Sequence, residues 1–349
     1  MKTYDELKQV ADSFFDACRS LTKSHPWLVC LAMHEYARNT YPEDPYIPFE
    51  RNVCPTERLH TVTSNLIQFL DVGSRMGSYG LPHSRRESDG QAEVKEATGR
   101  VYGRLWSKFT PEQLVEKARD ILAERLSKNG IPLEVIRGKR CVDVGCGSGR
   151  FSFALRMLGA ESVTGIDYGT PGLGIGEAVA KGQGITNVEF QTANILDLPF
   201  DDESFDFTYS NGVIHHSEDM EKGLSELFRV TKKGGRIWLY IYADGGIFWY
   251  SRKVMPEILK EIPQEYTMMI LDSIGMPSDR FIFSDNWYVP IERHTSLVEC
   301  RRLLEQYNPQ AITRLEHGRD TDLEDQAIFG GGVGAVMYGD GELRFLIVK

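Results

Sequence analysis

The sequence predicts an α/β protein in which a largely parallel β-sheet follows a helical N-terminal part. Before Gly130, apolar residues recur at helical spacing. After Gly130, short runs of β-type residues alternate with helical patterns, as in βαβ units. One predicted strand ends in three closely spaced glycines, Gly145, Gly147 and Gly149. Such a turn at the carboxyl end of a parallel strand favours a ligand site there.

The first 130 residues are expected to be mostly helical. The predicted helices cover residues 4–23, 25–38, 56–71, 91–108 and 111–128. Prolines over residues 39–55 predict a loop, and the glycine- and serine-rich stretch 73–90 predicts a connector. We therefore expect two domains, residues 1–130 as a helical lid or substrate domain and residues 131–349 as the sheet domain.

Seven strands and four helices are predicted in the second domain. The strands cover residues 140–144, 162–167, 188–191, 205–210, 236–243, 312–315 and 343–348. The helices cover residues 150–158, 175–181, 220–230 and 296–306. The aromatic stretch 245–290 is expected to be a helical insertion outside the sheet.

Composition excludes several classes of protein. The chain has 349 residues, 41% hydrophobic and 26% charged, which is typical of a soluble globular protein. Its formal net charge of -10 argues against a nucleic-acid partner. No apolar run approaches the ~20 residues of a membrane span, and no secretory signal precedes the first helix, so a cytoplasmic protein without membrane contact is expected. The six cysteines show no metal-ligand spacing, so we expect no metal.

The glycine-rich turn distinguishes two classes of cofactor. A dinucleotide fingerprint needs Gly-x-Gly-x-x-Gly, but Arg150 stands where its third glycine would be. The spacing present is Gly-x-Gly-x-Gly, and Asp143 lies two residues before it. A second strand ends in Asp167, eighteen residues after Gly149, where a carboxylate suits two ribose hydroxyls.

The segment Cys141–Arg150 resembles motif I of class I S-adenosylmethionine (SAM)-dependent methyltransferases. Later features agree in order: Asp167, the stretch 193–200 that ends in Leu-Pro-Phe and continues through 201–206 into strand four, the run 211–216 after that strand, and the turn 232–236. The run 211–216 resembles the ubiquinone-biosynthesis-like, or type 11, small-molecule subgroup. The resemblance covers about residues 130–245. It implies a Rossmann-like sheet of seven strands, mostly parallel with the last strand antiparallel, and SAM as cofactor.

The resemblance also implies a set of cofactor-binding residues. These are Asp143, Gly145, Cys146, Gly147, Gly149, Asp167, Asn194, Ile195 and Asn211. Asp143 would lie near the ammonium group and Asp167 at the ribose. Asn194 stands where the family often has an acidic residue, and an amide can also accept from the adenine amino group. The alternatives are that the carboxylates only cap strand ends, that Asn194 only shapes a turn, and that Cys146 only fills space.

Two histidines are candidates for catalysis. Methyl transfer is an in-line displacement in which a hydroxyl acceptor must lose a proton. His215 and His216 follow strand four, and either could be a general base or an orienting donor, unless it caps the next helix or packs in the core. Candidate substrate residues are Tyr102, Trp106, Tyr242, Arg293 and His294. Core packing for the aromatic residues, and helix capping around 293–296, are the alternatives.

The leading hypothesis is therefore methyl transfer from SAM to a small-molecule acceptor, with O-methylation ahead of C- or N-methylation. A nicotinamide-dependent oxidoreductase and a non-catalytic SAM-binding regulatory module are the competing classes. No Asp/Asn-Pro-Pro-Tyr motif follows strand four, which argues against methylation of nucleobase amino groups. A homodimer formed through the N-terminal part is a further hypothesis.

Overall fold

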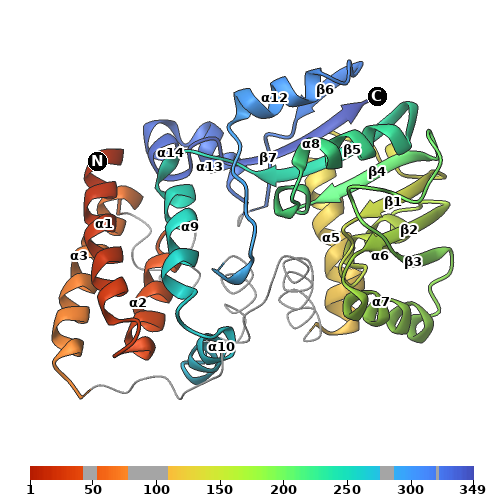
Figure 1. Cartoon of the computed structure of the whole chain (residues 1–349). Coiled ribbons are helices and arrows are strands. Elements are labelled where there is room, and N and C mark those ends of the chain that lie inside the picture. Colours follow the sequence, from red (N-terminus) through yellow and green to blue (C-terminus); the bar gives the residue numbers. More distant parts are fainter. Residues whose placement is uncertain (42–52, 78–108, 276–286, 320–321) are drawn as a thin grey trace. The chain divides into compact units, whose positions relative to one another are not determined.

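The computed structural model describes residues 1–41, 53–77, 109–275, 287–319 and 322–349, which form two compact units (Figure 1). The sheet unit consists of the described residues of Asp89–Ala243, Pro290–Glu324 and Glu342–Lys349. The helical unit consists of the described residues of Met1–Ser88, Asp244–Val289 and Asp325–Gly341. The predicted helix 91–108 lies outside the described residues.

Seven strands of the described chain form one sheet in the order β3-β2-β1-β4-β5-β7-β6. Their bounds are β1 Arg140–Val144, β2 Ser162–Asp167, β3 Val188–Thr192, β4 Phe205–Asn211, β5 Thr231–Tyr242, β6 Ala311–Arg314 and β7 Glu342–Val348. Strands β1 to β5 pair in parallel, and β7 is antiparallel to both β5 and β6. The predicted fold class is thus confirmed. The strand order reverses between β1 and β4, which is where ligands bind in such sheets.

One face of the sheet is covered by two helices, α5 and α6. α5 (Pro111–Lys128) and α6 (Arg150–Met157) pack on each other and enclose a core with β1, β2, β4 and β5. Tyr209 and Trp238 lie in this core, with ring centroids 5.5 Å apart and nearly parallel planes. Asp143 points to the same face as Cys141, because side chains two residues apart in a strand share a face.

The remaining helices that the structure describes in the sheet unit connect the strands. They are η2 (Leu133–Val135), α7 (Thr170–Gln183), η3 (Ile214–His216), α8 (Met220–Val230) and α12 (Leu297–Glu305). Asp219 caps α8 by accepting from the Lys222 N–H, and Ser296 caps α12 through the Glu299 N–H. These caps fix the first residue of each helix. Because α8 begins only at Met220, η3 remains a separate short turn directly after β4.

In the helical unit, the secondary structure of the described residues consists of helices. They are α1 (Tyr4–Leu21), α2 (Pro26–Arg38), α3 (Pro55–Ser74), α9 (Gly246–Leu259), α10 (Gln264–Ser273), α13 (Glu324–Phe329) and α14 (Gly331–Tyr338). A stacked Phe14–Tyr36 pair, with ring centroids 5.0 Å apart, joins α1 to α2. The Tyr36 hydroxyl lies 2.8 Å from Ser251 Oγ on α9. None of the described helices has an apolar stretch long enough to cross a bilayer.

Several features differ from the sequence-based expectation. β5 begins at Thr231 rather than at residue 236, α7 begins at Thr170 rather than at residue 175, and the sequence predicts neither α13 nor α14. α14 is rich in glycine, which usually indicates a loop. A Cβ on Gly334 would lie 1.9 Å from the Gln326 carbonyl oxygen, so α13 and α14 meet only because a glycine is there.

The two compact units divide the chain differently from the expected boundary at residue 130. α5 belongs to the sheet unit, and residues 244–289 and 325–341 return to the helical unit. The interpretation of residues 1–130 as a lid or substrate domain stays a prediction.

Candidate active site

The glycine turn between β1 and α6 has the backbone that its sequence predicts. Gly145, Gly147 and Gly149 all have positive φ, between 57° and 80°, a region that side-chain-bearing residues rarely occupy. A Cβ on Gly145 would lie 2.3 Å from Val213 Cγ1, and one on Gly149 would lie 2.4 Å from Phe190. The three glycines therefore allow the turn to pass close to its neighbours.

Asp143 lies beneath this turn and is buried. Its Oδ2 accepts a hydrogen bond of 2.7 Å from the Ser152 hydroxyl on α6. Burial raises the pKa of Asp143 to about 7, although the bond from Ser152 opposes this. A cation brought close to this carboxylate would favour its ionised form.

Asp167 ends β2 and ties two loops together. Its Oδ2 accepts from the Gly147 N–H at 2.9 Å, and its Oδ1 accepts from the Gly169 N–H at 2.7 Å. Partial burial raises the pKa of Asp167, and these two N–H donors oppose the rise. A carboxylate has about four acceptor sites, so two bonds leave capacity for further donors.

Three other predicted cofactor residues, Asn194, Ile195 and Cys146, differ in burial and in hydrogen bonding. The Asn194 Oδ1 accepts from the Leu196 N–H at 3.0 Å, a turn contact, and its adenine-binding role stays a prediction. Ile195 is half-buried beside it. Burial raises the pKa of the Cys146 thiol well above its usual value, so the thiol is protonated and a poor nucleophile.

The end of β4 presents Asn211 in a defined orientation. The Trp238 indole N–H donates to the Asn211 Oδ1 at 3.1 Å, so the amide nitrogen points the other way. The hydroxyls of Ser148 and Ser210 are buried, and neither has a hydrogen-bond partner within the described part of the chain. Buried polar groups of this kind usually have a partner, which is consistent with a polar ligand near the glycine turn and the end of β4.

The two candidate catalytic histidines differ sharply. His215 is fully buried, and its ring stacks on Tyr242 at a centroid distance of 3.8 Å. His216 is only partly buried, and its Nδ1 lies 2.7 Å from the Ile291 carbonyl oxygen. A carbonyl only accepts, so Nδ1 carries the proton, and in the neutral ring Nε2 carries the lone pair.

Of the predicted substrate residues, three lie at this edge of the sheet. Tyr242 ends β5, and its ring centroid is 6.2 Å from that of His294. The Arg293 guanidinium is exposed and donates to the Glu218 carbonyl at 2.7 Å, next to the start of α8. Tyr102 and Trp106 lie outside the described residues.

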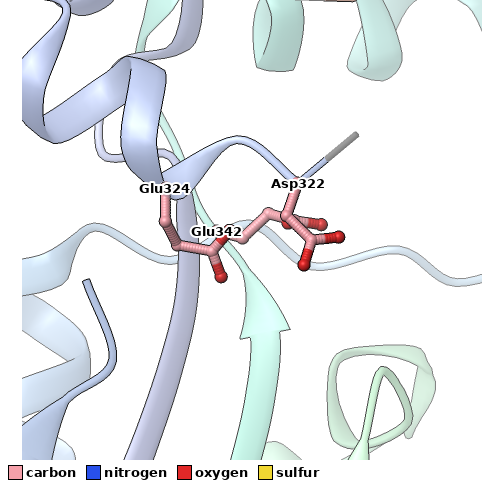
Figure 2. Close-up of side chains that lie close together, drawn as sticks. All are labelled: Asp322, Glu324 and Glu342. Carbon is pink, nitrogen blue, oxygen red and sulfur yellow. The ribbon is translucent and has the colours of Figure 1, made fainter. Parts of the chain in front are cut away.

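A group of three acidic side chains is the one place in the described ranges where a metal ion could be held. Asp322, Glu324 and Glu342 bring one carboxylate oxygen each within 4.8 Å of the others (Figure 2). Glu324 is fully buried, and Asp322 is nearly so. The sequence predicts no metal ion. Whether these three carboxylates need one depends on the positive charge that their neighbours supply.

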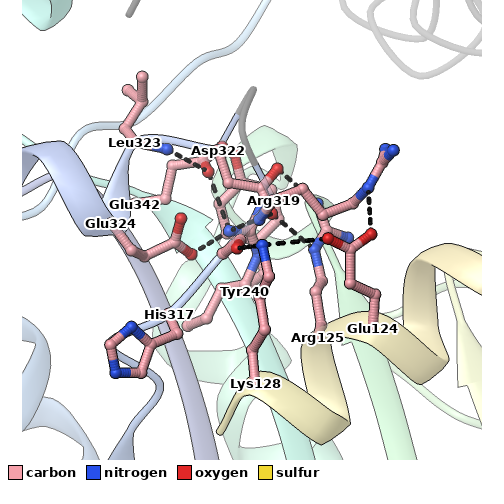
Figure 3. Close-up of polar contacts among 12 residues, drawn as sticks. Glu124, Arg125, Lys128, Tyr240, His317, Arg319, Asp322, Leu323, Glu324 and Glu342 are labelled. Carbon is pink, nitrogen blue, oxygen red and sulfur yellow. Dashed lines mark hydrogen bonds and ion pairs between the residues drawn. The ribbon is translucent and has the colours of Figure 1, made fainter.

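Arginine side chains already supply the positive charge there (Figure 3). The Arg344 Nη1 makes ion pairs with Glu324, with Glu342 at 2.9 Å and with Asp322 at 3.4 Å. Arg125 of α5 donates two hydrogen bonds to Asp322, at 2.8 and 2.7 Å. Burial alone would raise the pKa of Asp322. The two guanidinium groups outweigh burial and hold this pKa well below its usual range. Arg344 thus takes the position that a metal ion would need.

Four residues that make polar contacts at these sites could not be found from the sequence. Ile291, Glu292, Arg125 and Arg344 stand in no motif, and their partners are far away in the chain. Ser152 carries a weak signal, because it lies one helical turn after the glycine turn and faces β1. The others meet their partners only through sheet pairing and loop packing.

Comparison with known proteins agrees with this geometry. A family model described as a methyltransferase domain matches residues 142–239, from β1 into β5. A demethylmenaquinone methyltransferase of Geobacillus kaustophilus is 32% identical over 143 residues, which cover 38% of this chain and 61% of that protein. The enzyme of the same name from Geobacillus stearothermophilus is 36% identical, with the same shares covered.

A ubiquinone biosynthesis O-methyltransferase of Sinorhizobium fredii is 26% identical over 205 residues, covering 53% of this chain and 81% of that protein. The chain spans 61% of the length of the two Geobacillus relatives. The matched part holds the glycine turn, Asp167 and the two histidines. Residues 142–239 thus match a methyltransferase domain, and the named relatives agree with the resemblance of this part to the class I SAM-dependent methyltransferases of the type 11 group.

Proposed function

We propose that this protein transfers a methyl group from SAM to a hydroxyl group of a small-molecule acceptor, with His216 as the general base. The observation that carries the proposal is the 2.7 Å contact between His216 Nδ1 and the Ile291 carbonyl oxygen. It holds the neutral ring in the form whose Nε2 can take a proton. The ring stands in η3, directly after the carboxyl end of β4.

His215 is the weaker candidate for the base. It is fully buried and stacked on Tyr242, so a substrate hydroxyl has less access to it. We assign to His215 and Tyr242 the support of His216, whose ring centroid lies 4.2 Å from that of His215 and 5.5 Å from that of Tyr242.

The residues around the glycine turn fit SAM. Gly145 and Gly149 hold the turn at positive φ, packed against Val213 and Phe190, so that its backbone could face a ligand. Asp167 retains acceptor sites for ribose hydroxyls, and Asp143 would face the ammonium group. The buried hydroxyls of Ser148 and Ser210 could each gain the partner that they lack among the described residues. When bound, SAM supplies an electrophilic methyl group on a sulfonium sulfur.

The chain's own residues then have two tasks. The glycine turn, Asp143 and Asp167 would hold SAM. His216 orients the acceptor hydroxyl and removes its proton as the bond between oxygen and methyl carbon forms. The leaving thioether is neutral and needs no acid. The net charge of -10 supports a small molecule over a nucleic acid as the acceptor. One relative is itself named an O-methyltransferase of ubiquinone biosynthesis.

The test is the His216→Asn variant, because Asn can still donate to the Ile291 carbonyl but has no basic nitrogen. Methyl transfer from labelled SAM to a panel of hydroxylated aromatic compounds should fall by about 10²–10⁴-fold. SAM affinity, measured by calorimetry, should stay within twofold of wild type. His317→Asn, an exposed histidine of the same unit, is the control and should keep full turnover.

Two results would contradict the proposal. Turnover of His216→Asn within threefold of wild type would remove His216 as the base. A product in which the methyl group sits on carbon or nitrogen, shown by mass spectrometry and NMR, would replace O-methylation by the alternative chemistry.

A further inference from the structure

Residues 290–295, which we call the strap, are bound to the ends of β4 and β5. The Arg293 N–H donates to the His215 carbonyl at 2.9 Å, and the Thr295 N–H donates to the Tyr242 carbonyl at 3.2 Å. Two residues before Arg293, the Ile291 carbonyl oxygen lies 2.7 Å from the His216 Nδ1. The strap therefore supplies a contact that favours the proton of His216 on Nδ1.

One side-chain pair within the strap is almost completely enclosed. The Glu292 carboxylate lies 2.9 Å from His294 Nε2, and the two side chains are 8% and 4% exposed. The other ring nitrogen, His294 Nδ1, lies 2.9 Å from the Ala243 carbonyl oxygen, just after β5. Both ring nitrogens of His294 thus face oxygen atoms, one of a carboxylate and one of the backbone.

Such a pair is an effective anchor. Separating two enclosed polar side chains would leave each without its partner, and this favours the paired arrangement. His294 connects the pair to the backbone after β5, and Glu292 follows Ile291 directly in the chain. Movement of Glu292 would therefore move the Ile291 carbonyl.

We propose that the Glu292–His294 pair is a positioning element, which anchors the strap so that the Ile291 carbonyl keeps His216 protonated at Nδ1. The inference rests on the proposed function, in which His216 is the base. Glu292 acts through His216 and has no contact with the reacting atoms in this assignment. Glu292 thus adds to the site a residue that the sequence did not indicate.

The experiment uses the full chain and the Glu292→Gln variant, which keeps the shape of the side chain and removes its charge. Long-range ¹H–¹⁵N NMR of the imidazole rings reports which nitrogen is protonated. The chain has eight histidines, and the spectrum of His216→Asn assigns the relevant signal by its loss. Wild-type protein should show His216 protonated at Nδ1, and Glu292→Gln should show a mixture of the two tautomers.

Turnover provides the second measurement. Glu292→Gln should lower kcat about tenfold to a hundredfold while SAM affinity stays within twofold. In the background of His216→Asn, the same change should have no further effect, because residues that act through one another are not additive. Glu305→Gln, an exposed carboxylate on α12, is the matched control and should change neither measurement.

The outcomes separate this inference from the proposed function. If His216→Asn is inactive but Glu292→Gln keeps both the His216 tautomer and kcat, the positioning role is wrong and the base is retained. If His216→Asn is active, the proposed function fails first. Should Glu292→Gln not fold, His294→Asn tests the same pair, since Asn can still donate to the Ala243 carbonyl but cannot reach Glu292.

Discussion

Replacement of Arg344 by Met should destabilise the sheet unit more than any surface change. Arg344 is 3% exposed, and its Nη1 touches Glu324, Glu342 and Asp322. Met fills a similar volume without charge. Arg125 would still pair with Asp322, but Glu324 and Glu342 would lose their buried cation. Breaking a buried pair in this way costs roughly 3–5 kcal/mol.

The cost should depend on pH in a definite direction. Burial already raises the pKa of Glu324, and removal of Arg344, whose charge opposes this rise, would raise the pKa of Glu324 further. A group whose folded-state pKa lies above its unfolded value contributes stability at low pH that is lost as pH rises. The difference between Arg344→Met and wild type should therefore be smaller at pH 5 than at pH 8.

Urea unfolding followed by tryptophan fluorescence measures this difference, and two variants serve as references. Glu324→Gln mimics the protonated carboxyl group and should cost under about 1 kcal/mol. Arg302→Met removes an exposed arginine of α12 and should cost under about 0.5 kcal/mol. A loss below about 1 kcal/mol for Arg344→Met, or an equal loss at pH 5 and pH 8, would refute the reasoning.

Three further predictions concern the cofactor side. Gly145→Ala should weaken SAM binding at least tenfold in calorimetry, because φ is +80° and the new Cβ would lie 2.3 Å from Val213; wild-type affinity would contradict this. Asp167→Ala should weaken SAM binding about 10- to 100-fold, as expected for charged hydrogen bonds, and unchanged affinity would exclude the ribose contact. The pKa of Asp143 is raised to about 7, so its contribution to stability is present at acidic pH and falls by up to ~1.4 kcal/mol per pH unit between about pH 4 and pH 7. Asp143→Asn should lack this dependence in urea unfolding at pH 5 and pH 7, and a variant as pH-dependent as wild type would show that another group is responsible.

Local pattern predicted much of the sheet. β1 and β2 have the predicted bounds, because a continuous apolar run that ends at glycine or aspartate admits few other structures. The same pattern led to the glycine turn and to Asp167, whose roles depend on residues close in sequence. Helix α14 was missed, because its glycines are explained by contact with Gln326 rather than by local preference.

The sequence by itself determined the fold class, the family resemblance and the place where a ligand would bind, because each depends on short-range periodicity and on a contiguous turn. The sequence did not distinguish His215 from His216 as the candidate general base. The tertiary structure distinguished them, since stacking on Tyr242 buries one and the Ile291 carbonyl sets the proton on the other. Glu292 with His294, and Arg344 with its three carboxylates, became visible only in three dimensions. The physical reason is that burial and hydrogen bonding depend on which distant segments the sheet brings together, and no local spacing encodes that.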